Sequence, residues 1–256
     1  MIRDSLILAK RTVTKMVRNP EQFLDVTLQP IILTVVFVFI FGGSLAATTG
    51  GRYVEYALPG IIVQTIMFTS LTIGVNLNTD IQKGIFDRFR SLPISRSAPL
   101  FGAVLGDIVR HSIAITVTLV FGAIIGFTFV TPWWHVAIAI LLIIAFAVSL
   151  CWVSVLIGML ARTSGAVQGI SFLIVFPLTF GSSTFVSASK LPDWLQGWVT
   201  INPVTHVIEA MRGLLTGSTF QAGDTTAGQI LWVLASCVVL VAVFFPLATW
   251  AYRKKI

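Results

Sequence analysis

Charged residues, histidines and cysteines are scarce in this sequence. Of its 256 residues only 11% are charged, three are histidines and two are cysteines, whereas 56% are hydrophobic. A soluble domain cannot bury so much apolar surface, so the composition predicts an all-α integral membrane protein. Cys151 and Cys237 both lie inside apolar runs, where a free thiol behaves as a small hydrophobe, so neither a disulfide framework nor a metal site is expected.

The sequence motifs of common catalytic sites are also missing. The dipeptide Gly-Lys never occurs, so the chain has no P-loop, and no H-x-x-x-H, C-x-x-C or G-x-S-x-G motif organises a metal or a nucleophile. His111, His135 and His206 are far apart along the chain. We therefore expect no catalytic residue, metal or cofactor on this chain, and any uphill transport must draw its energy from a partner.

Ionisable residues are nearly missing from the middle of the apolar segments, although a carrier driven by an ion gradient usually needs such groups within the membrane. Asp107, Arg110 and His111 lie near the start of one segment. The first two either pair as neighbours three residues apart on a helix or belong to a proton relay. The polar residues of another segment either line a polar path or form interhelical hydrogen bonds: Gln64, Asn76 and Asn78.

Six apolar segments are long enough to cross about 30 Å of hydrocarbon, which takes roughly 20 residues of helix. They cover residues 28–48, 56–78, 105–130, 134–160, 168–187 and 228–251. With both termini on the cytoplasmic side, 14 of the 17 basic residues lie on cytoplasmic segments. Because cytoplasmic flanks collect Lys and Arg, this bias predicts an N-in, C-in orientation. The net charge of +7 indicates membrane lipids, not nucleic acid, as the partner of these residues.

The first cytoplasmic segment, residues 2–20, is predicted to contain a surface helix over residues 2–18. One face of this helix is apolar, comprising Ile2, Leu6, Ala9, Val13, Met16 and Val17. Basic residues occupy the other face, which is typical of a helix that lies in the membrane interface, and a frayed basic tail is the alternative. Asn19-Pro20 then turns the chain toward the bilayer.

The longest cytoplasmic loop, residues 80–97, carries a second amphipathic helix. Its apolar stripe is formed by Ile81, Ile85, Phe86 and Phe89. Arginines surround this stripe, Pro93 ends the helix, and Ser97 is expected to cap the next span. Such a helix either presents apolar anchors and arginines to a soluble partner or rests on lipid headgroups.

The outer segment, residues 188–227, is expected to hold two short helices. Trp194 and Trp198 suit the membrane interface. Asn202 is predicted to cap a helix that begins at Pro203 and stops at Gly217. This helix has a broad apolar face, comprising Val204, Val207, Ile208, Met211, Leu214 and Leu215. Its other face carries His206, Glu209 and Arg212, so Glu209 is either a functional carboxylate or the partner of Arg212.

Two stretches, GIFDRFRSLPISRS from Gly84 to Ser97 and NPVTHVIEAMRGLLTG from Asn202 to Gly217, carry a resemblance to a known family. Together with six spans and the N-terminal helix, they resemble the type 2 permeases of ABC exporters, especially the daunorubicin and doxorubicin resistance permeases. The resemblance covers nearly the whole chain as a single transmembrane domain, residues 1–256. It implies a dimer, either of two copies or with a sister permease, in which two separate nucleotide-binding ATPase subunits bind ATP and Mg.

The resemblance also implies roles for particular residues. The ATPase-coupling helix would comprise Ile81, Ile85, Phe86, Asp87, Arg88, Phe89, Arg90, Leu92 and Pro93, and residues 2–18 would pack beside the ATPase. Many relatives have a Glu-rich lead-in where this chain has Asp80, Gln82 and Lys83. The outer helices would dip back into the outer leaflet and close the exit, with Trp194, Trp198, His206 and Glu209 as gate residues. The substrate pathway would include Gln64, Asn76, Phe172, Phe176 and Phe180, although the phenylalanines are equally typical of a core-packing stripe.

The expected function is therefore efflux of a lipophilic compound, such as a drug, an antibiotic or a lipid, across the cytoplasmic membrane of a bacterium. Export of a lipid-linked glycan by the same architecture, a gradient-driven carrier and a non-transporting membrane anchor for a cytoplasmic partner are the alternatives. The scarcity of intramembrane charge argues against the carrier.

Overall fold

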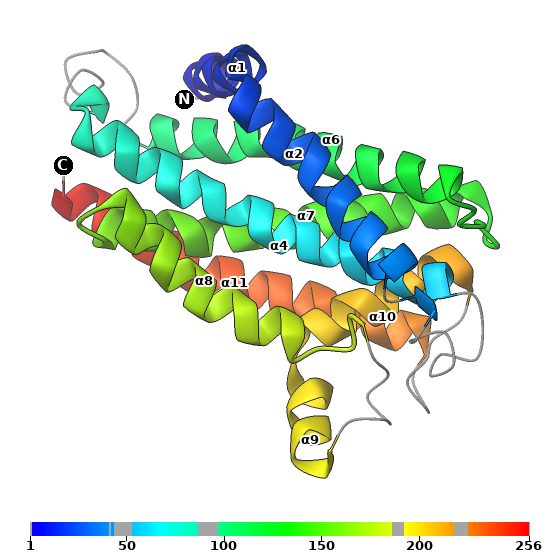
Figure 1. Cartoon of the computed structure of the whole chain (residues 1–256). Coiled ribbons are helices and arrows are strands. Elements are labelled where there is room, and N and C mark those ends of the chain that lie inside the picture. The colour runs from blue at the N-terminus through cyan, green and yellow to red at the C-terminus, as the bar shows by residue number, and fades with distance from the viewer. Residues whose placement is uncertain are drawn as a thin grey trace.

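The protein is described by a computed structural model over residues 2–40, 42–43, 53–86, 97–185, 192–217 and 225–255. Every element in these ranges is helical. The helices are α1 (Ile2–Arg18), α2 (Pro20–Val35), the π-helical turn η1 (Val36–Ile40), α4 (Tyr53–Gln82), α6 (Ala98–Ile124), α7 (Trp133–Leu160), α8 (Ser164–Phe180), α9 (Asp193–Ile201), α10 (Pro203–Thr216) and α11 (Thr226–Lys255). Figure 1 shows the longest of them side by side along one axis, which confirms the all-α membrane fold.

Five helical segments are long and apolar enough to cross a membrane: Pro20–Ile40, α4, α6, α7 and α11. The fifth expected span, 168–187, corresponds to α8, which has only 17 residues and begins earlier, at Ser164. Thr163 sets this start, because its side chain accepts a hydrogen bond from the Ala166 amide. Crossing the membrane takes roughly 20 residues of helix, so α8 is short for a full span.

Two other expected boundaries were wrong. The first span begins at Pro20 and not near residue 28, because Asn19 caps it by accepting a hydrogen bond from the Glu21 amide and Pro20 suits the first helical position. The third spans 98–124 and not 105–130, because α6 begins with the expected turn at Pro99 and Gly126 closes it with φ 96°. Ser97 makes no side-chain capping hydrogen bond.

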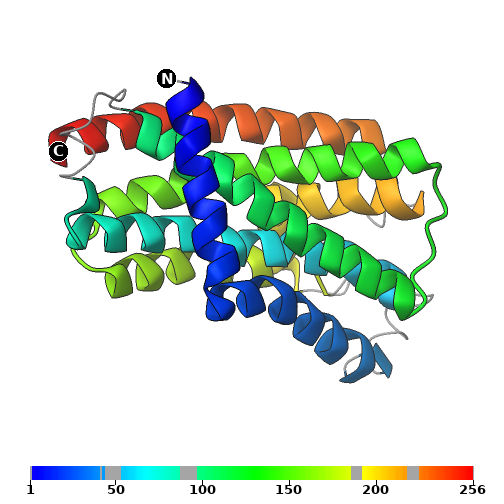
Figure 2. The same cartoon turned by 90° about the horizontal axis from the view of Figure 1, so that it is seen from above.

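The bundle has two ends, which we call the α1 end and the α10 end. The α1 end carries α1, the last turn of α4, the connection between α7 and α8 and the C-terminal turn of α11 (Figures 1 and 2). The α10 end carries α10 and the connection between α6 and α7. Because the basic termini share one end, the arrangement agrees with the N-in, C-in expectation.

Helix α1 lies across the bundle, inward of the last turns of α4 and α11, and packs on α6 (Figure 2). A Cβ atom on Gly102 would lie 2.5 Å from the Cβ of Leu8, and one on Gly106 would lie 2.7 Å from the Cβ of Thr12, so only glycine permits this approach. The side of α1 that docks on α6 is therefore not its apolar face alone. Met16 is buried, whereas Leu6 and Val17 are more than half exposed and stay available to the membrane interface, where the helix was expected to lie.

Helix α4 lies at the centre of the molecule, and 83% of its apolar 18-residue stretch is buried by the rest of the protein. It crosses α7 at backbone contact, since a Cβ on Gly158 would lie 2.5 Å from the carbonyl oxygen of Gly74. Asn78 fastens the same crossing by donating to the carbonyls of Gly158 and Ala161, both at 2.9 Å. The interhelical-bond alternative for Asn78 is thus confirmed.

Helices α9 and α10 lie within residues 188–227, the segment that was expected to hold two short helices. Asn202 caps α10 by accepting from the Val204 amide at 3.0 Å, and Gly217 ends it with φ 74°, as predicted. The expected apolar face of α10 is buried against α4, α7 and α11. In contrast, α9 projects away from the bundle (Figure 1), and its Trp194 is 77% exposed.

Candidate functional site

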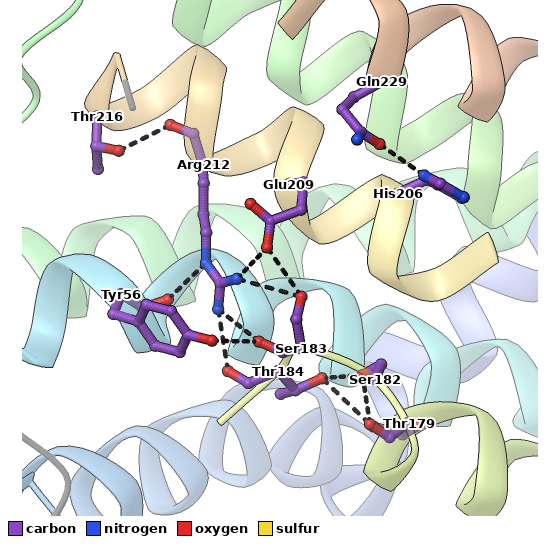
Figure 3. A network of polar contacts seen from close by, with 10 residues as sticks. All are labelled: Tyr56, Thr179, Ser182, Ser183, Thr184, His206, Glu209, Arg212, Thr216 and Gln229. Atoms are coloured by element: carbon purple, nitrogen blue, oxygen red, sulfur yellow. Dashed lines mark hydrogen bonds and ion pairs between the residues drawn. The ribbon is translucent and has the colours of Figure 1, made fainter. Parts of the chain in front are cut away.

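The most elaborate polar site is at the α10 end, around the guanidinium of Arg212 (Figure 3). Arg212 is 0% exposed, and its Nη1 lies 2.6 Å from Oε1 of Glu209, one turn earlier on α10. The prediction that these two residues pair is confirmed. The guanidinium carbon also lies 3.7 Å from the centre of the Tyr56 ring, in the geometry of a cation–π contact.

Arg212 uses all of its donors. Its Nε donates to the Tyr56 carbonyl at 3.1 Å, Nη1 donates to Glu209 and to Ser183 Oγ, and Nη2 donates to the carbonyls of Ser183 and Thr184. Arginine has five N–H groups, so the buried charge is fully hydrogen-bonded. A buried ion pair repays its desolvation only when the remaining groups are satisfied in this way.

This network, which we call the Arg212 network, joins three parts of the chain. Tyr56 lies in the first turn of α4, Glu209 and Arg212 lie on α10, and Ser183 and Thr184 follow α8. The Tyr56 hydroxyl donates to the Ser183 carbonyl at 3.0 Å, and Ser183 Oγ donates to Glu209 at 2.9 Å. The segment after α8 is therefore fixed between α4 and α10.

Asn202 strengthens the same junction from the other side. While its side-chain oxygen caps α10, its side-chain nitrogen donates to the carbonyls of Leu178 and Gly181, at 2.8 and 2.9 Å. One residue thus satisfies the start of α10 and the end of α8 together. Nearby, His206 Nδ1 lies 2.7 Å from Gln229 Oε1, and its ring stacks on Trp232 of α11.

A second buried cluster joins α4, α6 and α7. Arg110 Nε lies 3.5 Å from Asp107 Oδ1, which confirms this pair. Cys151 Sγ lies 3.7 Å from Asp107 Oδ2, and His111 Nε2 lies 2.9 Å from Ser70 Oγ. Within the described ranges, Asp107, His111 and Cys151 could hold a metal ion, since their ligand atoms lie within 4.8 Å of one another. However, Arg110 already balances the carboxylate, and His111 Nδ1 is occupied by the Asp107 carbonyl at 2.7 Å.

At the α1 end, two basic residues of α1 meet the last turns of α4. Arg11 lies 3.5 Å and Lys15 lies 3.4 Å from the carboxylate of Asp80, and both basic side chains are 42% exposed. A polar pocket opens beside this link, which we call the Asp80 link, and its lining includes Asn76, Asp107 and Arg110. The Asp80 link ties α1 to the helix that leads into the 80–97 loop.

The expected coupling residues divide between described and undescribed parts of the chain. Ile81 lies in the last turn of α4 and not in a separate helix, because Gly84 interrupts the helix with φ 65°. Ile85 and Phe86 follow, and Phe86 is 4% exposed and packs edge-on against Tyr252 of α11. Asp87, Arg88, Phe89, Arg90, Leu92 and Pro93 lie outside the described residues.

The residues predicted for the substrate pathway do not form one cluster. Phe172, Phe176 and Phe180 are 44%, 51% and 47% exposed, so they are not a core-packing stripe. Phe176 and Phe180 continue through Phe185 to Phe37 as a row of aromatic rings, whereas the ring of Phe172 contacts Phe68 of α4. Gln64 is 2% exposed and its Oε1 has no hydrogen-bond partner, whereas Asn76 lies near the α1 end.

The predicted gate residues are also separated. Glu209 belongs to the Arg212 network, and His206 faces α11 on another side of α10. Trp198 is 45% exposed and lies against Gly181, where a Cβ would be 2.5 Å from its indole nitrogen. Trp194 stands on the exposed side of α9.

The fold and these sites define an all-α, multi-pass membrane protein whose described buried polar groups join helices to one another. Residues 4–216 match the family model described as ABC-2 type transporter, and the chain belongs to this family. The predicted resemblance is therefore confirmed, and the chain is the transmembrane permease of an ABC exporter, a class of membrane component that works with an ATPase partner.

This chain aligns with several relatives over most of its own length and most of theirs. The chain is 38% identical to the daunorubicin resistance ABC transporter permease protein DrrB1 of Streptomyces coeruleorubidus, over 92% of this chain and 81% of that protein. It is 25% identical to the putative transport permease ycf38 of Cyanophora paradoxa, over 86% and 76%. It is 23% identical to the probable doxorubicin resistance permease DrrC of Mycobacterium tuberculosis, over 99% and 89%.

Proposed function

We propose that this chain forms the pathway by which an ATP-driven exporter moves a lipophilic compound outward across the bacterial cytoplasmic membrane. The names of two relatives, which refer to daunorubicin and doxorubicin resistance, support a drug-like substrate. ATP and magnesium would bind to two separate ATPase subunits, and a second permease, either a copy or a sister chain, would complete the pathway.

One observation carries the proposal: α4 connects the two charged sites without a break. It has 30 residues, which at 1.5 Å per residue is about 45 Å of helix. Tyr56 in its first turn holds Arg212, and Asp80 in its last turn is held by α1. A displacement of the 80–97 loop by an ATPase would therefore reach the α10 end through one rigid element.

The coupling step follows from this geometry. When ATP closes the ATPase subunits, the coupling residues around Arg88 and Arg90 would move, and α4 would carry the motion toward the segment that Arg212 holds. Rearrangement of that segment and α10 would then release the substrate outward. This sequence of events requires no titration of a group within the spans. The corrected start of α6 places Asp107, Arg110 and His111 near the middle of that helix and not at its start, and there they contact one another and Ser70.

The proposal is tested by reconstituting the chain with its ATPase in lipid vesicles and measuring ATP-dependent transport and substrate-stimulated ATP hydrolysis. An adjacent gene for a P-loop ATPase identifies the partner to use. Arg88→Glu and Arg90→Glu are expected to abolish substrate stimulation, whereas Arg162→Glu, which reverses an exposed charge at the same end of the bundle, is expected to preserve it.

Two results would separate the alternatives. If the ATPase binds but no compound moves and hydrolysis ignores both substitutions, the chain is a membrane anchor and the transport proposal fails. If transport occurs only with a lipid-linked glycan and not with lipophilic drugs, the exporter architecture holds and the substrate class proposed here is wrong.

A further inference from the structure

A groove inside the bundle lies between α4, α7 and α8. Its lining comprises Met67, Ser70, Leu71, Leu150, Val153, Ser154, Ile157, Ser171, Ile174, Val175 and Leu178. The apolar members come from all three helices, and so do the three serines: Ser70 from α4, Ser154 from α7 and Ser171 from α8. The lining contains no charged residue. We call this feature the three-serine groove.

The groove is next to a point where the three helices meet closely. A Cβ on Gly74 of α4 would lie 2.3 Å from the Ser154 carbonyl oxygen of α7 and 3.2 Å from Val167 Cγ1 of α8. Beyond this point α8 continues along α4, since Thr179 Oγ1 lies 3.6 Å from Met67 Sδ. The groove thus has a fixed floor on α4, with α7 and α8 as its walls.

Three buried hydroxyl groups of the described helices have no hydrogen-bond partner, those of Thr65, Ser171 and Thr205, and only Ser171 lies in the lining of the groove. Serine and threonine in a helix commonly donate to the carbonyl four residues earlier, as Ser112, Thr118 and Ser149 do. Ser171 is 1% exposed, yet its Oγ has no hydrogen-bond partner. Because an unpaired buried hydroxyl is unfavourable, its position in the groove wall favours a ligand that supplies the missing hydrogen bond.

The lining also restricts the chemistry of such a ligand. Apolar side chains with a few placed polar groups are typical of small-molecule sites. The cavity here has a volume of about 40 Å³, so it admits one small polar group of a ligand, while the apolar remainder would lie along the bilayer side of α7 and α8. The pocket at the α1 end is different, since charged residues line it, including Asp80, Asp107 and Arg110. A charged group would be desolvated without a counter-charge in the three-serine groove, whereas a neutral hydroxyl or carbonyl could pair with Ser171.

The groove can be reached from the hydrocarbon region. Ile174 on its α8 side is 42% exposed, and Leu150, Val153 and Ile157 on its α7 side are half-buried. A molecule in the bilayer could therefore enter the groove without passing the charged ends of the bundle. A molecule dissolved in the bilayer would meet the apolar edge first and Ser171 last.

From these observations we propose that the three-serine groove is a binding site for an uncharged lipophilic molecule with a hydroxyl or carbonyl group, which Ser171 recognises. The further step, that this molecule belongs to the class of exported compounds, rests on the proposed function. Ser171 would then determine specificity at an entry site inside the membrane, separate from the ATPase-coupling residues.

The binding site is tested with the full-length chain in lipid nanodiscs. The probe is 4-[3-(trifluoromethyl)-3H-diazirin-3-yl]benzyl alcohol, and the matched probe carries CH₃ in place of CH₂OH. After illumination, labelling of α4, α7 and α8 is quantified by peptide mass spectrometry and normalised to labelling of the lipid-facing α11. We expect the alcohol to label the groove about fivefold more than the matched probe, the factor that one neutral hydrogen bond typically contributes.

Ser171→Ala is expected to remove this preference. Ser236→Ala is the matched control, because Ser236 is exposed on α11 and bonds to its own helix at 2.8 Å. The thermal unfolding temperature of Ser171→Ala should not fall, since the lost oxygen had no partner and its burial was unfavourable. Equal labelling by the two probes, or a preference that survives Ser171→Ala, would overturn the site.

The link to export is tested separately, by transport in reconstituted vesicles with Ser171→Leu, which fills the groove. Loss of transport with intact basal ATP hydrolysis supports an entry site on the export path. Unchanged transport together with Ser171-dependent labelling overturns only that link and leaves a lipid-facing binding site. If no ATPase couples to the wild-type chain while the labelling pattern holds, the proposed function fails and the site stands.

Discussion

The Arg212 network and the Asp80 link both contain ion pairs and lie at opposite ends of α4, yet they differ in burial, in the distance between the charges and in hydrogen bonding. Arg212 and Glu209 are 0% and 2% exposed and lie 2.6 Å apart, with every donor of the guanidinium used. Arg11 and Lys15 are 42% exposed and reach Asp80 only at 3.4–3.5 Å. The first site is a fixed joint, whereas the second can open at little cost.

The difference suggests a division of labour along α4. A partner that pulls on the α1 end meets a weak, solvent-screened contact, so that end can adapt to a docked protein. The α10 end responds only when a complete hydrogen-bonded network rearranges. Four substitutions test this comparison, and they are ordered here from the largest expected effect to the smallest.

Arg212→Met should have the largest effect, because it leaves Glu209 buried without its counter-charge and removes the donors to the carbonyls of Ser183 and Thr184. Breaking a buried pair by removing one partner typically costs about 3–5 kcal/mol. We expect a loss of that size in unfolding experiments in detergent. The double variant Arg212→Met, Glu209→Leu should recover part of the stability, and no recovery would show that the charge of Glu209 is not the cause.

Glu209→Gln should cost less, about 2 kcal/mol, which is typical of a hydrogen bond to a charged group. Arg212 keeps its three carbonyl acceptors and the Tyr56 ring in this variant. The measurement is again the free energy of unfolding, with Glu55→Gln, a half-buried carboxylate on α4, as the control. A loss as large as that of Arg212→Met would mean that the ion pair alone holds the joint.

Gly106→Ala tests whether close packing on α6 holds α1 in place. The exposed ion pairs of Arg11 and Lys15 with Asp80 are too weak to hold it alone. The new Cβ would lie 2.7 Å from Thr12 Cβ, and overpacking of this kind typically costs about 1–3 kcal/mol. We expect α1 to shift, as detected by faster proteolysis of residues 2–18. Gly169→Ala on α8 is the control, because no atom lies within 4 Å of that position, and an equal effect there would contradict the docking of α1 through glycine.

Asp80→Asn should change stability least, by less than about 1 kcal/mol, as is typical of exposed ion pairs. Under the proposed function its effect is on coupling: substrate-stimulated ATP hydrolysis should fall while basal hydrolysis persists. Raising the salt concentration should mimic the substitution in the wild-type chain. A stability loss similar to that of Glu209→Gln would break the contrast between the two ends of α4.

Local sequence signals predicted α10 well. Asn202, Pro203 and Gly217 mark its ends, and its apolar face is buried as the spacing predicted. The opposite face, which carries His206, Glu209 and Arg212, is buried as well, and the spacing did not predict this. Helix α7 was similarly clear, at 133–160 against a prediction of 134–160, because Pro132 precedes it and its apolar run ends before Arg162. Each of these signals is contained within a few neighbouring residues, so one sequence is enough to detect it.

The predictions failed where a boundary or face depends on a distant partner. The side of α1 that docks on the bundle was not predicted, because Gly102 and Gly106 of α6 decide it. Tyr56, Ser183 and Thr184 were not identified as partners of Arg212. The one available signal was Arg212 itself, a charge on a helix that is otherwise apolar enough to be buried.

Composition was enough to predict that this chain lies in a membrane and that its basic residues gather at one end of the bundle. Short motifs were enough to predict where α10 is capped and which family the chain resembles. The tertiary structure alone decided which groups meet. Arg212 is bound mainly by backbone carbonyls, one of them 156 residues away, and Ser171 faces a groove formed by three helices. Every residue type has a carbonyl, and a helix crossing depends on many weak contacts, so neither leaves a signature in the residues themselves.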